Sequence, residues 1–324
     1  NFLEYSVKSI FHNKSQCFRL EWLSQSITDI GFSMRVCDYV NIVSEKFSAE
    51  PLSYGHGTDN AHDEATFLVY AKLKLDFNTK ESACRIVSEI EIDQIDTLVQ
   101  IRIKDRVPVA YLVGRAWFAG KEFICDDRAL IPRSPIAELI QNEFAGVFDF
   151  VPEQILDLCC GGGCIGIAAA IEYSHAKVEM VDVSEEALAL SQENVTLHEL
   201  DSRIKTYRSD LFTEVTNKFD LILTNPPYVS SEECGTLPME YDHEPQLGLI
   251  SEDRGLALPI SILKNAEGFL TDNGVLILEV GYSHRALSER LYDIPLLWLE
   301  LGMGGEGVLA ITKTELARYK ARFV

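Results

Sequence analysis

ILDLCCGGGCIG, residues 155–166, is the stretch that decides the fold. Its first four residues are mainly aliphatic, as in a buried strand, and three consecutive glycines and a run rich in isoleucine and alanine follow. Glycine allows positive φ angles and close approach of a ligand to the backbone, and the first turn of a helix offers free N–H groups. The stretch therefore predicts a strand, a glycine loop and a helix, with a ligand bound at the loop.

An acidic residue at the end of the next strand extends this candidate ligand site. The β-branched run 177–183 predicts a strand, and Ser184 followed by two glutamates opens another helical pattern. Asp182 should therefore lie at the carboxyl end of its strand, 19 positions after Gly163. A carboxylate in that position suits a ribose, because it can accept hydrogen bonds from both hydroxyl groups.

The glycine loop alone fits two classes of enzyme. Gly161, Gly163 and Gly166 spell the G-x-G-x-x-G pattern with which a nicotinamide dehydrogenase binds pyrophosphate. A methyltransferase would use the same glycines for the amino-acid portion and ribose of S-adenosylmethionine. The segment 207–212 favours the methyltransferase, because Asp210 can bind an adenine amino group while Leu211 packs on the ring.

The tetrapeptide Asn225-Pro226-Pro227-Tyr228 follows the apolar run 221–223. The prolines fix their own φ angles and bias the preceding residue toward an extended conformation, which makes the nearby acceptors rigid. An incoming NH2 group could donate one hydrogen to the side-chain oxygen of Asn225 and the other to the carbonyl of Pro226. Tyr228 adds an aromatic face that attracts a cation such as a sulfonium. The alternative interpretation is an ordinary strand-ending turn.

Together these segments resemble the class I S-adenosylmethionine-dependent methyltransferases, and within them the protein glutamine methyltransferases related to HemK. The resemblance extends to residues 106–114, 118–120 and 130–140. It implies S-adenosylmethionine as cofactor and no metal. The cofactor-binding residues that it implies are Asp157, Cys159, Gly161, Gly163, Asp182, Asp210, Leu211 and Asn225. Asn225, Pro226 and Tyr228 are implied to be catalytic, and Pro227 completes the substrate-binding tetrapeptide.

Two departures from the general family pattern indicate a branch. Members that act on translation release factors typically carry R-P-E-T-E where this chain has RSPIAE at residues 133–138. Cys159 stands where many methyltransferases have the first glycine of the loop. Both features resemble the branch that methylates a glutamine in ribosomal protein L-three of the large subunit. The alternatives are a release-factor glutamine methyltransferase, a DNA adenine methyltransferase and a nicotinamide-dependent dehydrogenase.

The cysteines of the glycine loop also suggest a metal or redox site. Cys159, Cys160 and Cys164 do not have the C-x-x-C spacing of a zinc knuckle, however. Cys160 and Gly162 are unusual for the family and leave the detailed loop geometry open.

The chain predicts two domains and a connection. Residues 1–107 have helical patterns, one of them with Asn60 as a candidate N-cap, and are expected to form a substrate-recognition domain. Residues 108–131 alternate as in a β-hairpin linker. Residues 132–324 should form an α/β catalytic domain, a seven-stranded doubly wound sheet. The expected strands are 155–158, 178–183, 204–208, 219–224, 275–280, 296–301 and 307–312. The last two should form the antiparallel hairpin that ends a class I methyltransferase, whereas a dehydrogenase usually ends with parallel units.

Composition and charge agree with a cytoplasmic enzyme. The chain has 324 residues, 47% of them hydrophobic, and its eight cysteines show no disulfide framework. Its start lacks the pattern of a signal peptide, and no membrane span is expected. The net charge of −21 opposes direct binding to nucleic acid and suits a basic ribosomal protein as partner. Residues 229–254 contain seven acidic residues and a single arginine, which predicts an acidic surface that grips the substrate.

Overall fold

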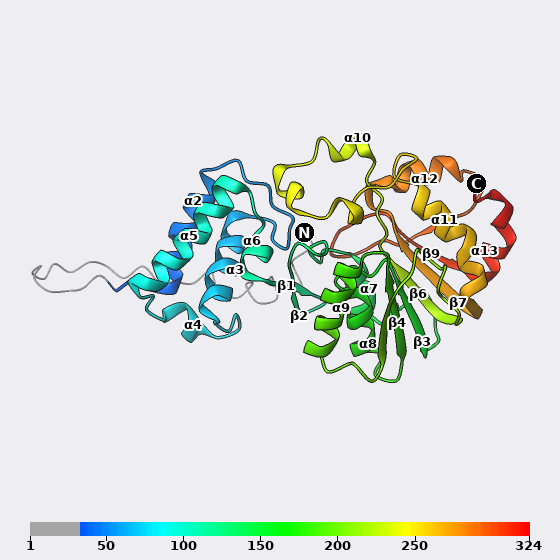
Figure 1. The fold of residues 1–324 in the computed structure, drawn as a ribbon, viewed down its shortest axis with the longest axis horizontal. Coiled ribbons are helices and arrows are strands. Elements are labelled where there is room, and N and C mark those ends of the chain that lie inside the picture. The colour runs from blue at the N-terminus through cyan, green and yellow to red at the C-terminus, as the bar shows by residue number, and fades with distance from the viewer. Residues whose placement is uncertain (1–32) are drawn as a thin grey trace, which may run out of the picture. The chain divides into compact units, whose positions relative to one another are not determined.

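The computed structural model describes residues 33–324, which divide into two compact units at Gly114 (Figure 1). Residues 1–32, the first part of the expected helical domain, lie outside the described residues. The first unit ends at Val113 and the second covers 114–324. The division falls inside the segment predicted as a linker, and the domain roles stay predictions.

The first unit is helical. Its helices are α2 (Val36–Ser48), α3 (Ala61–Leu73), α4 (Lys80–Cys84), α5 (Glu89–Asp105) and α6 (Val109–Val113). The side chain of Asn60 accepts hydrogen bonds from the backbone N–H groups of His62 and Asp63, which confirms the predicted N-cap of α3. Ser88 and Glu91 form a capping box at α5. The local sequence thus sets where these helices begin.

A short β-hairpin opens the second unit. Strands β1 (Arg115–Phe118) and β2 (Lys121–Ile124) pair antiparallel, and Ala119 and Gly120 make the turn with φ angles of 47° and 73°. The prediction that the hairpin covers 108–131 was therefore too long. Residues 109–113 form α6 instead, because they directly follow Pro108, whose fixed φ is compatible with the start of a helix.

The second unit is built on a seven-stranded sheet in the order β5-β4-β3-β6-β7-β9-β8. Its strands are β3 (Gln154–Leu158), β4 (Lys177–Asp182), β5 (Ile204–Arg208), β6 (Phe219–Thr224), β7 (Leu270–Glu279), β8 (Leu297–Trp298) and β9 (Val308–Thr312). The neighbouring strands from β5 to β7 in this order are parallel, and β9 is antiparallel to its neighbours β7 and β8. This topology confirms the predicted class I methyltransferase fold with its C-terminal antiparallel hairpin.

The last hairpin is shorter than predicted. β8 pairs with β9 at two residues only, whereas the sequence indicated a strand over 296–301. Gly304, Gly305 and Gly307 follow with φ angles of 88°, 95° and 79°, and such a backbone cannot continue a pleated ladder.

Helices cover both faces of the sheet. They are α7 (Ile136–Gln141), α8 (Cys164–Glu172), α9 (Glu185–Leu197), α11 (Ala257–Asn265), α12 (His284–Arg290) and α13 (Lys313–Tyr319). The short helix α10 (Ser231–Cys234) has no buried residue and belongs to neither layer. One core cluster contains Ile155 of β3 with residues of α7, α8 and α9, and the other contains Leu156 with residues of α11, α12 and α13. Because neighbouring strand residues point to opposite faces, both must be apolar, and the central strands read as continuous apolar runs.

None of the helices within residues 33–324 combines the length and the apolar character needed to cross a lipid bilayer.

Candidate active site

The switch point of the sheet lies between β3 and β6, where the strand order reverses direction. Leu158 and Thr224 are register partners at the carboxyl ends of these strands, and the Thr224 hydroxyl donates to the Leu158 carbonyl over 2.7 Å. The segments that follow, the glycine loop and the tetrapeptide 225–228, therefore start side by side. Ligands of open α/β sheets bind in the crevice outside this edge.

The glycine loop adopts the conformation expected from its composition. Cys159, Gly161 and Gly163 have φ angles of 61°, 53° and 83°. A Cβ atom at Gly163 would lie 2.8 Å from Ser191 Oγ, and one at Gly166 would lie 2.6 Å from the Met180 sulfur. These two glycines allow α8 to pack closely. A Cβ at Gly161 would meet only Ala129 Cβ, at 3.8 Å, so Gly161 is not required by packing. Cys159 keeps the positive φ of the glycine that it replaces.

Asp157 lies beneath this loop. It is fully buried, and its Oδ2 accepts a hydrogen bond of 2.8 Å from the backbone N–H of Gly166 in α8. Burial raises the pKa of Asp157 to about 7, against the opposing effect of that hydrogen bond. Its Oδ1 is buried without a hydrogen-bond partner among the described residues. An orphaned carboxylate oxygen next to the loop is an acceptor that suits a ligand N–H group.

Asp182 is held firmly at the end of β4. Its Oδ2 accepts from the backbone N–H of Gly161 over 2.9 Å, and its Oδ1 accepts from that of Ser184 over 3.0 Å. Burial raises the pKa of this carboxyl group, while the backbone hydrogen bonds lower it. Each oxygen has a further lone pair, so the carboxylate can still accept from a diol. The structure thus joins Asp182 to the glycine loop, as the ribose hypothesis requires.

Asp210 and Leu211 follow β5 beside this carboxylate. The backbone N–H of Ser209 donates to the Asp182 carbonyl over 2.9 Å. Asp210 is exposed, and Leu211 is half-buried with a φ of 48°. Their proposed contacts with an adenine remain predictions.

The tetrapeptide is fixed through Tyr228. The carbonyl of Tyr228 accepts a 2.8 Å hydrogen bond from Ser283 Oγ, and a Cβ at Gly281 would lie 2.7 Å from the tyrosine ring. Asn225 is half-buried and Pro226 is buried. The polar amide of Asn225 therefore stands at the edge of the sheet on a backbone that is held from both sides. The roles assigned to Asn225, Pro226, Pro227 and Tyr228 stay predictions.

Sequence reasoning missed Glu279. This residue ends β7, is 3% exposed, and its Oε1 accepts from the Tyr228 hydroxyl over 3.4 Å. Ser134 Oγ donates to its other carboxylate oxygen. Burial raises the pKa of Glu279 to about 7 although Ser134, Tyr228 and Arg133 oppose the shift. The sequence did contain a signal for this residue, because Glu279 is an acidic residue directly after the apolar run 275–278, at the end of a buried strand.

An ion pair between the half-buried Arg133 and the buried Glu244, next to this network, was also missed. Both oxygens of Glu244 accept from the guanidinium of Arg133, over 2.5 and 2.6 Å, and Oε1 also accepts from the backbone N–H of Ile131 over 3.0 Å. Glu244 and Glu240 are 3% and 2% exposed. The predicted acidic surface 229–254 therefore loses two of its seven carboxylates, because both side chains are buried, and Glu244 neutralises Arg133.

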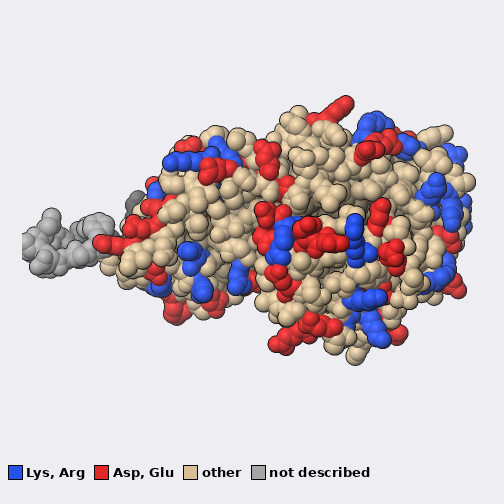
Figure 2. Space-filling view, in the orientation of Figure 1, with Lys and Arg blue, Asp and Glu red and all other residues tan. Residues whose placement is uncertain are grey.

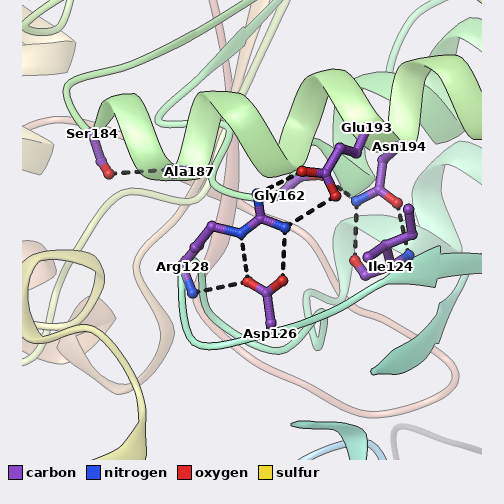
Figure 3. Close-up of polar contacts among 8 residues, drawn as sticks. All are labelled: Ile124, Asp126, Arg128, Gly162, Ser184, Ala187, Glu193 and Asn194. Carbon is purple, nitrogen blue, oxygen red and sulfur yellow. Dashed lines mark hydrogen bonds and ion pairs between the residues drawn. The ribbon is translucent and has the colours of Figure 1, made fainter. Parts of the chain in front are cut away.

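A side-chain amide braces the glycine loop from below (Figure 3). Asn194 of α9 accepts from the backbone N–H of Ile124 over 2.7 Å, and its Nδ2 donates to the carbonyls of Ile124 and Gly162 over 3.1 and 3.0 Å. One buried amide thus ties the end of β2 to the loop.

An ion-pair clamp accompanies this brace (Figure 3). Arg128 contacts Asp126 and Glu193, each over 2.7 Å. All three side chains are partly exposed, and such pairs are worth up to about 1 kcal/mol each. The clamp therefore holds residues 124–128 against α9 and contributes little to the free energy of unfolding.

Among the loop cysteines, Cys160 is buried and Cys159 and Cys164 are half-buried. Burial raises the pKa of both Cys160 and Cys164 well above the usual value. Cys159, Cys160 and Cys164 form no disulfide. Between residues 33 and 324, no cluster of three or more His, Cys, Asp or Glu side chains could hold a metal ion.

The raised pKa of Glu279 has a measurable consequence for stability. A carboxyl whose pKa rises from 4.5 to about 7 on folding favours the folded state below pH 4.5 and loses that contribution as pH rises through 7. At about 1.4 kcal/mol per unit, the loss is roughly 3 kcal/mol. Glu279→Gln is neutral at all pH values, so we expect its free energy of unfolding to fall less than that of wild type between pH 5 and 8.

Urea unfolding at both pH values tests this expectation. Glu185→Gln, at an exposed ion pair with Arg208, is the control and should follow wild type. Equal pH dependence of wild type and Glu279→Gln would show that Glu279 does not ionise in this range.

Comparison with known proteins identifies the family of the chain. The model of the methyltransferase small domain matches residues 141–237. The ribosomal protein uL3 glutamine methyltransferase of Francisella tularensis is 42% identical over 291 residues, which cover 88% of this chain and 92% of the relative. The protein of the same name from Xanthomonas campestris is also 42% identical, over 89% of this chain and 94% of its own length.

A crystal structure of a methyltransferase from Pyrococcus furiosus aligns with a TM-score of 0.43 and 16% identity, over 70% of this chain and 99% of its own. That alignment is too weak to add to the argument. The identity to the two relatives, over nearly their full length, confirms the resemblance found in the sequence. The chain therefore belongs to the ribosomal protein uL3 glutamine methyltransferase family.

Proposed function

We propose that this protein transfers a methyl group from S-adenosylmethionine to the side-chain amide nitrogen of a glutamine in ribosomal protein uL3. The observation that carries the proposal is the placement of Asn225 and Pro226 directly after β6, next to the glycine loop that follows β3. The names of the two relatives support the choice of uL3 as substrate.

The residues around the glycine loop fit S-adenosylmethionine. The orphaned Oδ1 of Asp157 suits an ammonium group, and Asp182 has free lone pairs for a ribose. Gly161, Gly163 and Cys159 would line the amino-acid portion and the ribose, while Asp210 and Leu211, beyond β5, would hold the adenine. The cofactor supplies a methyl group on a positively charged sulfur. The protein's own contribution is to bind and orient both partners.

The acceptor amide needs orientation because its nitrogen lone pair is delocalised into the carbonyl. The Asn225 side-chain oxygen and the Pro226 carbonyl would each accept one N–H of the glutamine amide and fix the direction of its nitrogen. Holding two reactants in a productive geometry can supply roughly 7–11 kcal/mol of the barrier. Glu279 and Ser283 keep Tyr228, and with it the tetrapeptide, in place. We assign substrate recognition to residues 1–107, which contain none of the predicted catalytic residues.

Parallel transfer assays test the proposed function. Purified uL3, a release factor and DNA are each incubated with the enzyme and a radiolabelled methyl donor, and the modified residue is located by mass spectrometry. We expect label on one glutamine of uL3. Label on the release factor or on DNA alone would overturn the assignment.

The exposed acids that remain after Tyr228 should attract a basic substrate. Between residues 229 and 253 the chain has no lysine or arginine. Electrostatic steering raises association rates by about 10–1000-fold at low salt. We expect roughly tenfold slower association with uL3, and unchanged cofactor affinity, in a triple variant of exposed residues: Glu232→Gln, Glu233→Gln and Asp242→Asn.

Stopped-flow association at increasing salt measures this effect, which should shrink as salt screens the charges. A matched control neutralises three exposed acids near the amino ends of the strands: Asp149→Asn, Glu153→Gln and Glu172→Gln. If both triple variants slow association equally, net charge rather than this surface is responsible.

A further inference from the structure

Residues 230–249, which we call the docking loop, leave the sheet immediately after Tyr228 and return to the same point. Val229 N–H donates to the Leu249 carbonyl and Ser251 N–H donates to the Val229 carbonyl, both over 2.9 Å. These bonds close the base of the loop beside the tetrapeptide that is proposed to hold the acceptor amide. The loop therefore borders the tetrapeptide to which a substrate glutamine would come.

The inner side of the docking loop is anchored by Glu244. Its carboxylate takes both ends of the Arg133 guanidinium and the Ile131 N–H, and the guanidinium lies 5.3 Å from the ring centre of Tyr241. The Glu244 carboxylate is buried, so removing Arg133 would leave its charge unpaired inside the protein, and the bidentate geometry favours the pair. The loop therefore has a defined position without any bound ligand.

The outer side of the same loop carries two large apolar side chains. Met239, which begins the 3-10 turn Met239–His243, is 60% exposed, and Leu247, in the turn Gln246–Gly248, is 61% exposed. They lie on either side of the anchoring Glu244 in the sequence. On the face in view, the region at α10 is largely uncharged with acidic atoms at its outer tip (Figure 2). Exposed apolar side chains of this size offer a bound polypeptide apolar surface to bury.

The charge of the loop specifies the partner. Its exposed carboxylates are Glu232, Glu233 and Asp242, and no lysine or arginine offsets them. Such a surface complements a polypeptide with basic side chains and at least one apolar side chain close to the modified glutamine. A polyanion would be repelled.

We propose that the docking loop binds the substrate polypeptide next to its acceptor glutamine. Met239 and Leu247 take apolar side chains of that polypeptide, and the Glu244–Arg133 pair is a positioning element that holds them at the site. This inference rests on the proposed function and adds to it the surface that selects the sequence around the glutamine.

Two variants with intact cofactor residues test the proposal. Met239→Ser/Leu247→Ser removes the apolar contact, and Glu244→Gln removes the charge that anchors the loop. We expect the KM for uL3 and its dissociation constant to rise about 10–100-fold in both, with kcat at saturating uL3 and the affinity for S-adenosylmethionine near wild type. Met239→Leu, which keeps an apolar side chain, should retain near wild-type KM.

Val151→Ser is the matched control. Val151 is 70% exposed but lies before β3, at the opposite edge of the sheet, so the KM should not change. Direct binding of uL3 by calorimetry separates the two hypotheses. If wild type methylates uL3 and the variants bind uL3 with unchanged affinity, the function is upheld and the docking surface is overturned. Wild type that binds uL3 through Met239 and Leu247 without methylating it overturns the function alone. Failure of wild type to bind uL3 overturns both the function and the docking surface. If the protein is a dimer that dissociates in Met239→Ser/Leu247→Ser, the surface instead binds a second copy of this chain.

Discussion

Asn225→Ala is expected to lower kcat for methylation of uL3 by about 100–1000-fold while the enzyme still binds S-adenosylmethionine. Loss of one preorganised hydrogen bond to the reacting group costs ~2.7–4 kcal/mol in the transition state. Asn225 stands at the end of β6 on a backbone fixed at Tyr228, so its side-chain oxygen is in place before the substrate arrives. Cofactor affinity should change little, because Asp182 and the glycine loop are untouched.

Single-turnover kinetics and calorimetry measure the two effects separately. Asn217→Ala is the matched control, since that amide donates to Glu179 outside the site and its loss should leave turnover intact. Asn225→Ala with near-normal turnover would remove Asn225 from the mechanism.

Asp182→Ala is expected to weaken S-adenosylmethionine by more than about 100-fold and to leave the affinity for uL3 nearly unchanged. Hydrogen bonds to a charged group contribute about 1.5–3 kcal/mol each, and a ribose offers two. The substitution also frees the backbone N–H groups of Gly161 and Ser184, so the loop loses the carboxylate that orders it.

Asp220→Ala controls for this second effect. Asp220 also accepts two backbone N–H groups, those of Glu153 and Gln154, both over 3.0 Å, but at the amino ends of the strands. Asp220→Ala should lower the free energy of unfolding without changing the affinity for S-adenosylmethionine. Unchanged cofactor binding in Asp182→Ala would show that the ribose assignment is wrong, and tight binding of a nicotinamide dinucleotide by wild type would favour the dehydrogenase.

Local patterns were enough to predict the sheet and the edge at which Asp182 and Asn225 lie. Apolar runs such as 221–223 mark strands buried on both faces, and the residues after each strand must meet at one edge when the strands are parallel. Asp182 and Asn225 could therefore be placed at that edge from the sequence.

Contacts between distant residues were beyond such patterns. Glu244 pairs with Arg133 across 111 positions, and Glu279 with Ser134 across 145. A glutamate in a loop reads as a solvated charge unless its partner is known, so Glu244 was assigned to the surface. The hairpin was drawn too long for a related reason, because a five-residue apolar run fits a strand or a short helix equally well.

The Asn194 brace links the dynamics of two segments that are far apart in the chain. An isolated two-stranded hairpin is marginal in water, and its amides would exchange with solvent through frequent fraying. Here, detaching β2 would break the two hydrogen bonds between Asn194 and Ile124, and the same amide also donates to the Gly162 carbonyl of the glycine loop. The amide of Ile124 should consequently exchange its hydrogen at the slow rate of the sheet, and ordering the glycine loop with a ligand should slow it further.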